Sequence, residues 1–288
     1  MDLNASGERR ALGKFAWAVL AWNIPVILWG AYVRASFSGD GCGAHWPFCN
    51  GQVIPQNMAA PMAIEFTHRA MTSVDSIAVI GLCVWAFLAF PKRSAVRLFS
   101  ILSLVFLCIE ALLGAGLVLF RFVAHDRSAG RAVYLSAHLT NTLLLLAALT
   151  ITAWLANTNI ERIEWTKVTA RLWTAAAVFL AVSVSGAIAA LGDMLFPAAS
   201  VASGMRQDFS SAASALLRLR TVHPLIATAG AAYLIWIAMP SLRAPKPQRA
   251  AAGRLIALVW MMLETVAQRE ARVSRANEIY ASLPVSAP

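Results

Sequence analysis

The chain of 288 residues is 59% hydrophobic and only 13% charged, with a formal net charge of +10. Its mean hydropathy of +0.65 excludes an ordinary soluble domain and is typical of a polytopic membrane protein. The basic residues stand in short clusters between apolar runs, a pattern that indicates membrane topology and not a nucleic-acid-binding surface.

Six apolar runs are near the ~20 residues that a helix needs to cross the hydrocarbon core. They are residues 15–33, 69–90, 98–120, 132–156, 171–191 and 222–240. No small-residue cleavage site interrupts the first run before Gly30, so we expect an uncleaved span and not a secretory signal. A seventh run starts at Leu255 but soon turns charged, which predicts a partial span. The predicted fold class is an all-α polytopic membrane protein, because lipid cannot satisfy an open backbone.

Lysine and arginine predict the orientation of these spans. Basic clusters occur in the N-terminal arm, the 91–97 loop, the 157–171 connection and the 241–254 loop, which share one side if the six spans hold. That side is predicted to be the cytoplasm, with the N-terminus inside. The predicted outer segments, 34–68, 121–131 and 192–221, also hold arginines that topology does not explain: Arg121, Arg127, Arg131, Arg206, Arg218 and Arg220.

The chain repeats itself weakly. "WGAYVRASFSGDG" closes the first run and "SGAIAALGDMLFP" closes the fifth, while "EFTHRAMTS" opens the second and "RTVHPLIAT" opens the sixth. This repeat predicts two tandem four-helix bundle halves, residues 1–156 and 157–288. The second half is predicted to be incomplete after about residue 268, where "REARVSR" stands in place of the apolar "GAGLVLF" of the third run.

Two cysteines, Cys42 and Cys49, lie in the Gly- and Pro-rich outer loop "GDGCGAHWPFCNGQVIP". An oxidising compartment favours a disulfide between them. The alternative is a zinc site, for which Cys42, His45 and Cys49 would supply at most three ligands.

Three histidines, His68, His138 and His223, are each predicted to start a span on the outer side. An ionisable side chain at that depth is costly unless it faces the bundle interior or a ligand; the alternative is an interfacial histidine bonded to a neighbour. Histidines paired across neighbouring helices suit haem, whose iron takes one imidazole on each face. We expect His68 and His138 to clamp one haem and His223 to serve a second, with outer arginines binding the propionates.

Glu65 precedes His68 by three residues, which places both on one helix face. A carboxylate at the rim of an apolar haem slot can accept a proton or stabilise positive charge on a substrate carbon. The alternative is a favourable charge at a helix start. Glu110 is predicted to be structural or paired, and Asp193 to be a turn residue.

These residues resemble a known family. "WGAYVRASFSGDGCGAHWPFCNGQVIP", "IEFTHR" and "AHLTNT" resemble the haem A synthase family, and "SGAIAALGD" and "VHPLIATAGAAY" resemble its second half, over about residues 15–265. The resemblance implies eight helices in two related halves. It also implies an oxidoreductase that converts the C8 methyl of haem O to a formyl group, giving haem A for terminal oxidases.

The resemblance also implies roles for single residues. Glu65 and His68 fall on catalytic positions, His68 and His138 on the ligands of the substrate haem O, and His223 on a ligand of haem b. Cys42 and Cys49 fall on a redox-active loop pair. Implied partners are membrane lipid, a haem O synthase, cytochrome oxidase assembly factors and a second copy of the chain, with no nucleic acid.

One departure from the family concerns the second haem. The family carries a fourth histidine at the start of an eighth helix, whereas no histidine follows His223 here. Ligation by His223 alone is expected to leave the iron high-spin and the activity impaired. The competing hypotheses are a non-catalytic haem-binding or b-type electron-transfer membrane protein, and a small-molecule transporter that holds no haem.

Overall fold

The computed structural model describes residues 3–158, 170–198, 201–210 and 215–243. These ranges form helices α1 (Leu3–Ala35), α2 (Ala60–Ala89), α3 (Ala95–Leu119), α4 (Ala129–Ala156), α5 (Ala170–Leu195), α6 (Val201–Asp208) and α7 (Ala215–Ala238), followed by a 3₁₀ turn, Met239–Arg243. No strand occurs within them, and six of the helices are long and apolar enough to cross a membrane. The predicted class, an all-α polytopic membrane protein, is confirmed.

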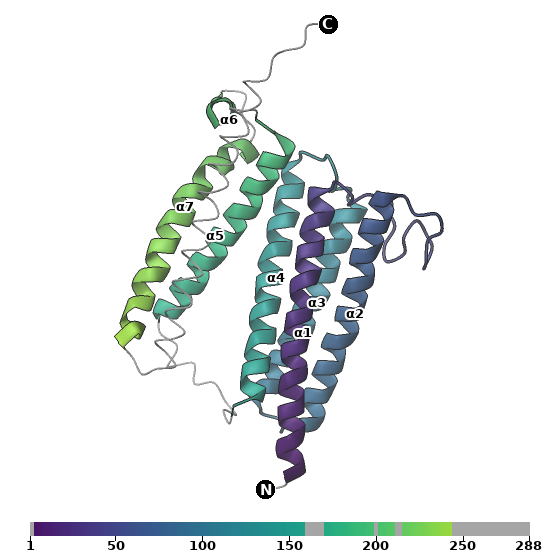
Figure 1. Ribbon diagram of the computed structural model, residues 1–288, viewed down its shortest axis with the longest axis vertical. Coiled ribbons are helices and arrows are strands. Elements are labelled where there is room, and N and C mark those ends of the chain that lie inside the picture. Colours follow the sequence, from purple (N-terminus) through teal and green to yellow (C-terminus); the bar gives the residue numbers. More distant parts are fainter. Residues whose placement is uncertain (1–2, 159–169, 199–200, 211–214, 244–288) are drawn as a thin grey trace, which may run out of the picture. The chain divides into compact units, whose positions relative to one another are not determined.

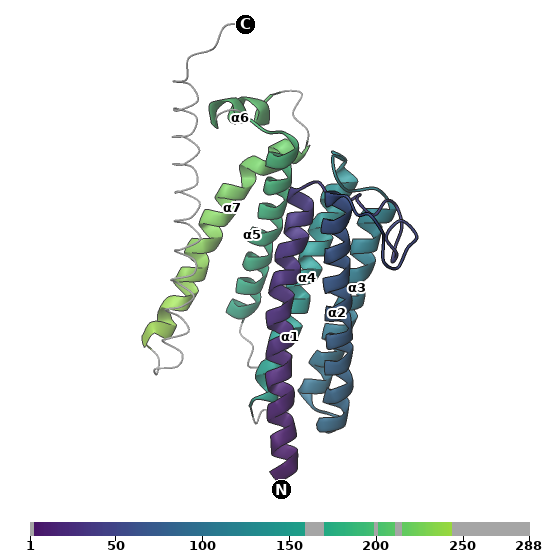
Figure 2. The same ribbon diagram turned by 45° about the vertical axis from the view of Figure 1, so that its right-hand side comes forward.

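The chain divides into two compact units, Met1–Lys167 and Val168–Pro288, and each is described by itself. In the first unit α1 to α4 run alongside one another as a bundle (Figures 1 and 2). Helix α1 packs against α2 and α4, and α3 packs against the same two helices. Helices α2 and α4 therefore occupy diagonal corners, so side chains that point inward from them face each other across the bundle axis.

The buried apolar core fills only one half of this bundle. Fully buried members come from the first half of α1 and α3 and the second half of α2 and α4: Leu12, Ala16, Val79, Leu82, Val96, Leu149 and Leu155. In lipid such packing stabilises through dispersion contacts, because the surrounding acyl chains are as apolar as leucine. The opposite half of the bundle, toward the α1–α2 and α3–α4 loops, is left for polar side chains.

Short sequence signals set the helix starts in the first unit. Helix α2 has Pro61 in its first turn, where the missing N–H leaves no hydrogen bond unmade. Ser94 and Ser128 cap α3 and α4, because their hydroxyl oxygens accept from the backbone N–H groups of Val96 and Arg131.

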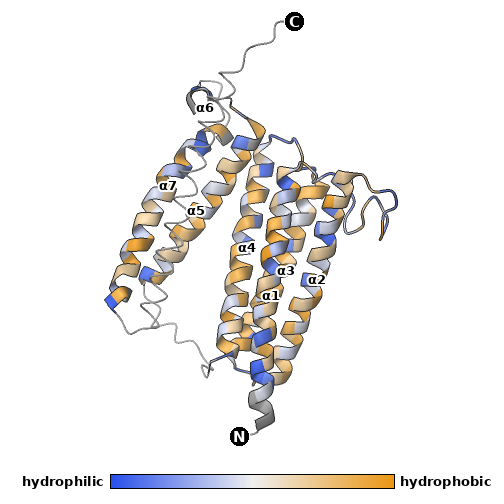
Figure 3. Cartoon of the chain, in the orientation of Figure 1, coloured by the Kyte–Doolittle hydropathy of each residue, from blue (hydrophilic) through white to orange (hydrophobic). Residues whose placement is uncertain are grey.

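The outer faces of the helices are apolar, as Figure 3 shows. Leu28, Ile77 and Leu88 are 65%, 72% and 80% exposed, which is the arrangement of helices surrounded by lipid. Polar groups turn inward instead: the buried Asn23 amide donates to Asp75 Oδ1 at 2.9 Å, joining α1 to α2.

The described part of the second unit is built around the pair α5 and α7, with α6 against α7. The pair is close, because a Cβ atom placed on Gly230 would lie 2.6 Å from Val182 Cγ2. The partial seventh run and the divergence after residue 268 lie outside the described residues.

Each of the six predicted runs corresponds to one long helix of the structure, but some boundaries were wrong. Helix α2 begins at Ala60 and not at residue 69, because Glu65 and Arg69 point toward the bundle and the disulfide loop and do not mark the end of a span. Helix α6 was not predicted. Asp193 lies in the last turn of α5 and is not a turn residue.

Candidate functional site

His68 lies two turns inside α2, as its ninth residue, and not at the helix start as predicted. Its ring faces Gly30 of α1: a Cβ atom on Gly30 would be 3.0 Å from His68 Cε1 and 3.3 Å from Nε2. His68 Nδ1 is buried with no hydrogen-bond partner in the structure. A buried, unpartnered ring nitrogen is uncommon and suggests that the ring serves a group besides the protein.

His138 lies at a matching depth, as the tenth residue of α4, and Gly114 of α3 is opposite its ring. A Cβ atom on Gly114 would be 3.8 Å from His138 Cε1, so this side is less crowded than that of His68. Because α2 and α4 are diagonal in the bundle, the two imidazoles approach the same half of it from non-adjacent helices. Two imidazoles from opposite helices, each against a glycine, fit the axial ligation of a haem iron.

Glu65 lies one turn from His68 on α2 and is 3% exposed. One carboxylate oxygen, Oε2, accepts from the backbone N–H of Cys42 at 2.8 Å. The other, Oε1, pairs with Arg69 Nη2 at 2.5 Å. A carboxylate held on both oxygens has a fixed direction, which a group acting on a substrate requires.

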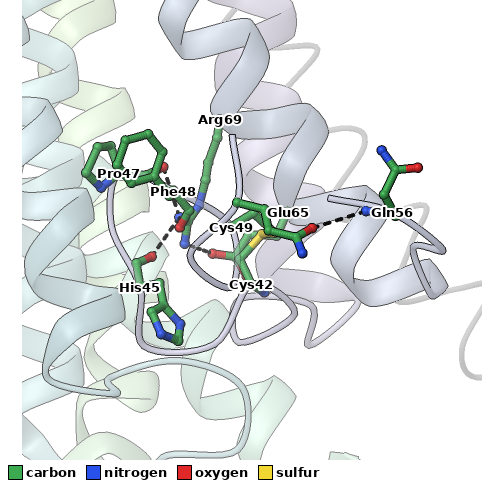
Figure 4. The surroundings of a disulfide bond; sticks show 9 residues. Cys42, His45, Pro47, Phe48, Cys49, Gln56, Glu65 and Arg69 are labelled. Atoms are coloured by element: carbon green, nitrogen blue, oxygen red, sulfur yellow. Dashed lines mark hydrogen bonds and ion pairs between the residues drawn. A yellow bond between two sulfur atoms is a disulfide. The ribbon is translucent and has the colours of Figure 1, made fainter. Parts of the chain in front are cut away.

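Arg69 connects this carboxylate to the outer loop (Figure 4). Its Nη1 donates to the carbonyl oxygens of His45 at 2.7 Å, Phe48 at 2.9 Å and Pro47 at 3.3 Å. One guanidinium thus holds Glu65 and the loop backbone together. This contact was not predicted from the sequence, in which residue 69 was only the first residue of the second apolar run.

The loop is closed by a disulfide between Cys42 and Cys49, with the sulfur atoms 2.04 Å apart. The predicted disulfide is confirmed, and the zinc alternative fails because both sulfurs are bonded to each other. Among the described residues, no group of three or more His, Cys, Asp or Glu side chains could hold a metal ion. Because the backbone N–H of Cys42 donates to Glu65, the disulfide lies directly beside this carboxylate (Figure 4).

The second unit repeats part of this arrangement. His223, the ninth residue of α7, faces Gly186 of α5, where a Cβ atom would be 3.1 Å from Cε1 and 3.4 Å from Nε2. His223 Nδ1 lies 3.0 Å from the hydroxyl of Ser185. The glycine–histidine contact is therefore common to both units. The surroundings of Nδ1 differ, because His223 Nδ1 has a hydroxyl partner and His68 Nδ1 has none.

The Glu65 carboxylate has no counterpart at the same place in the second unit. Arg220 stands three residues before His223, as Glu65 stands before His68. It bonds to Asp208 at 2.5 Å and to Asp193 at 3.0 Å, so it ties α7 to the ends of α6 and α5. Among the described residues of the second unit, the position three before the histidine therefore holds a base and not an acid.

Arg131 and Arg220, which were predicted to lie on the outer side, are held by protein partners. Arg220 is held by two aspartates, and Arg131 donates to the carbonyl oxygens of Ala124 at 2.5 Å and Asp126 at 2.9 Å. Both therefore hold the ends of their helices to neighbouring segments. This role was not predicted, since these arginines were expected to bind haem propionates.

Sequence reasoning underrated Glu110 of α3. It was expected to be structural or paired, and it is paired: its Oε1 lies 3.2 Å from His138 Nδ1. The signal was present in "AHLTNT", whose His138, Asn141 and Thr142 share one helix face and all approach this carboxylate.

Comparison with known proteins agrees with this geometry. Residues 13–268 match the family described as "Cytochrome oxidase assembly protein". The chain is 44% identical over 227 residues to a Thermus thermophilus protein named "Protoheme IX farnesyltransferase", covering 78% of this chain and 37% of that protein. It is 38% identical over 112 residues to "Heme A synthase" of Exiguobacterium sibiricum and 40% identical over 113 residues to that of Lysinibacillus sphaericus.

These matches span 39% of this chain and 38% and 37% of the two synthases, so the chain aligns with well under half of each relative. The family match, in contrast, extends over both units and includes Glu65, all three site histidines and the disulfide loop. The chain therefore belongs to the cytochrome oxidase assembly protein family.

Proposed function

We propose that the chain is a haem A synthase-type oxidoreductase, which converts the C8 methyl of haem O to a formyl group. The observation that carries this proposal is the pair His68 and His138, which enter one half of the bundle from diagonal helices with buried Glu65 one turn away. The relatives named "Heme A synthase" support the same reaction.

His68 and His138 would bind the iron of haem O, one on each face, and so fix the orientation of the macrocycle. The porphyrin itself activates the methyl group, so the protein needs to supply only position, charge and dryness. Gly30 leaves room beside His68, since a Cβ atom there would lie 3.0 Å from Cε1, whereas a Cβ atom on Gly114 would make an ordinary contact with His138 at 3.8 Å.

The reaction removes four electrons from one carbon and adds one oxygen atom. Each of two oxidations would add one hydroxyl to this carbon and pass two electrons to an external acceptor, giving first a hydroxymethyl group and then a gem-diol, which loses water to give the aldehyde. Protons leave at each oxidation, and positive charge develops on the carbon. Glu65 would receive those protons or stabilise that charge, and Arg69 and the Cys42 N–H would hold its oxygens in place.

His223 would ligate a haem b in the second unit, which would relay electrons from the substrate site. Arg220, which stands where the first unit has Glu65, suits electron transfer better than methyl oxidation. Residues 224–288 contain no histidine, so no second imidazole for this haem comes from them.

The proposed location is a bacterial inner membrane with the N-terminus in the cytoplasm. The six spans make the chain a multi-pass membrane protein. The N-terminal arm and the 91–97 loop carry lysine and arginine, which favour the cytoplasmic side, and the disulfide loop then faces the oxidising side. A haem O synthase and oxidase assembly factors are the proposed partners.

Prenyl transfer, suggested by the name of the Thermus relative, is less well supported. Prenyl diphosphates are usually bound through Mg²⁺ held by clustered carboxylates. The six aspartates of this chain are scattered, at positions 2, 40, 75, 126, 193 and 208. The match also covers only 37% of that relative, so the name need not describe the matching segment.

The proposal is tested by expressing the chain in a host that makes haem O but not haem A, then separating the extracted haems by chromatography. Formyl haem in the extract supports the synthase and excludes a purely haem-binding or electron-transfer protein. Glu65→Gln should retain bound haem but stop oxidation at or before the alcohol, while the exposed control Glu8→Gln should behave as wild type. Normal haem A yield from Glu65→Gln would remove Glu65 from the mechanism.

A further inference from the structure

We propose that Glu110 is a positioning residue that makes His138 the anchored ligand of the substrate haem and leaves His68 as the exchangeable one. This inference rests on the proposed function, because it assigns unequal roles to the two histidines of the same site. It follows from the different partners of three histidine rings that each belong to the ninth or tenth residue of their helix.

Glu110 is held firmly in front of His138. Its Oε1 lies 3.2 Å from His138 Nδ1, and its Oε2 accepts from Asn141 Nδ2 at 2.6 Å. Asn141 Nδ2 also contacts the carbonyl oxygen of Phe106 at 2.8 Å, and the Thr142 hydroxyl lies against Oε1. The carboxylate is therefore fixed by α4, although it belongs to α3.

The contact between Glu110 and His138 is close. Glu110 Oε1 lies 3.2 Å from His138 Nδ1, within reach of an ion pair, although Nδ1 makes no hydrogen bond in this structure. When Nε2 of a histidine binds a metal, its Nδ1–H usually donates to a carboxylate, a carbonyl oxygen or water, and Glu110 is the carboxylate in place to accept from His138.

The other two histidines lack this partner. His68 Nδ1 has no hydrogen-bond partner, and His223 Nδ1 faces the neutral hydroxyl of Ser185 at 3.0 Å. A carboxylate that accepts from Nδ1–H fixes the tautomer and increases the basicity of Nε2, and a hydroxyl does so less. The three rings thus form a series of increasing ligand strength from His68 through His223 to His138.

The order of this series matches what each site must do. A haem that is a substrate must enter and its product must leave, so at least one of its axial bonds must break readily. A haem that stays needs no such release. A strong bond on the His138 face and a weak one on the His68 face permit exchange without loss of the macrocycle's orientation.

The test is a double-mutant cycle read by equilibrium binding and not by activity. Full-length protein in detergent, carrying His223→Ala to silence the second site, is titrated with ferric haem O and followed at the Soret band. His138→Ala should weaken binding much more than His68→Ala. Glu110→Gln should weaken binding about 10- to 100-fold when His138 is present. In the His138→Ala background Glu110→Gln should have almost no further effect.

Two outcomes would overturn the inference. One is equal weakening by His68→Ala and His138→Ala; the other is a Glu110→Gln effect that persists without His138, which a purely structural carboxylate would give. If Glu110→Gln does not accumulate, Thr142→Val removes one contact of the carboxylate and should give a smaller loss with the same dependence on His138. If the cycle succeeds and no formyl haem is formed in cells, the proposed function fails and the ligand asymmetry stands.

Discussion

Arg69 joins the buried Glu65 carboxylate to the disulfide loop, and Arg69→Met is therefore the most informative single change. Its side chain is 14% exposed and that of Glu65 only 4%. The substitution keeps the aliphatic stem but leaves the buried Glu65 carboxylate with the Cys42 N–H as its remaining partner. It also removes the donor to three carbonyl oxygens of the disulfide loop.

The expected loss of stability is that of breaking the buried Glu65–Arg69 ion pair, not the sum of the individual hydrogen bonds. Removing one partner of a buried ion pair destabilises a protein by about 3–5 kcal/mol, because the other charge is left uncompensated. Converting 1 kcal/mol to about 2–4 °C for a unit of this size gives a fall in melting temperature of at least about 6 °C. The double variant Glu65→Gln, Arg69→Met should recover about 1–3 kcal/mol, since it no longer buries an unpaired carboxylate.

The assay is thermal unfolding in detergent, followed by tryptophan fluorescence. Arg121→Met is the matched control, because it makes the same chemical change at an exposed arginine and should stay within about 0.5 kcal/mol of wild type. If Arg69→Met has the same melting temperature as this control, or if the losses of stability in Glu65→Gln and Arg69→Met simply add, Glu65 and Arg69 are not an energetically coupled buried pair.

Two further predictions concern the site and its loop. Gly30→Ala should lower the haem affinity of the first unit about 2- to 10-fold, because the added Cβ would lie 3.0 Å from His68 Cε1 and force the ring off its rotamer. Gly81→Ala is the control: its added Cβ would have nothing within 4 Å, so the haem titration should be unchanged. Equal titrations for both variants would count against His68 as a ligand. A membrane-impermeant maleimide should fail to label Cys42 and Cys49 until a reductant is added; comparison with Cys42→Ser, Cys49→Ser corrects for Cys83 and Cys108, and immediate labelling would contradict the disulfide.

Much of the fold could be predicted from the sequence, because hydropathy over ~20 residues is a strong signal in lipid. The disulfide could also be predicted, from the loop composition and the side of the membrane. The start of α2 could not, since Glu65 and His68 look like the polar end of a span. Only the tertiary structure shows that they point into the bundle.

The histidines could be predicted as a set, but their surroundings could not. Gly30 and Gly186 read as part of a weak repeat, and their contacts with His68 and His223 appear only when the helices are packed. Glu110 is far from His138 in the sequence, so no local pattern joins them. The site is built from contacts between residues on different helices, and such contacts cannot be identified from a single sequence.

The recurrence of a glycine facing a histidine in both units has an evolutionary consequence. It is the pattern that duplication of an ancestral half, with one glycine and one histidine, would leave. The positions next to the ring differ between the two units: Trp29 and Glu65 stand in the first where Ser185 and Arg220 stand in the second. On that account, specialisation of the two halves would require substitutions around an inherited ligand and not the invention of a new one.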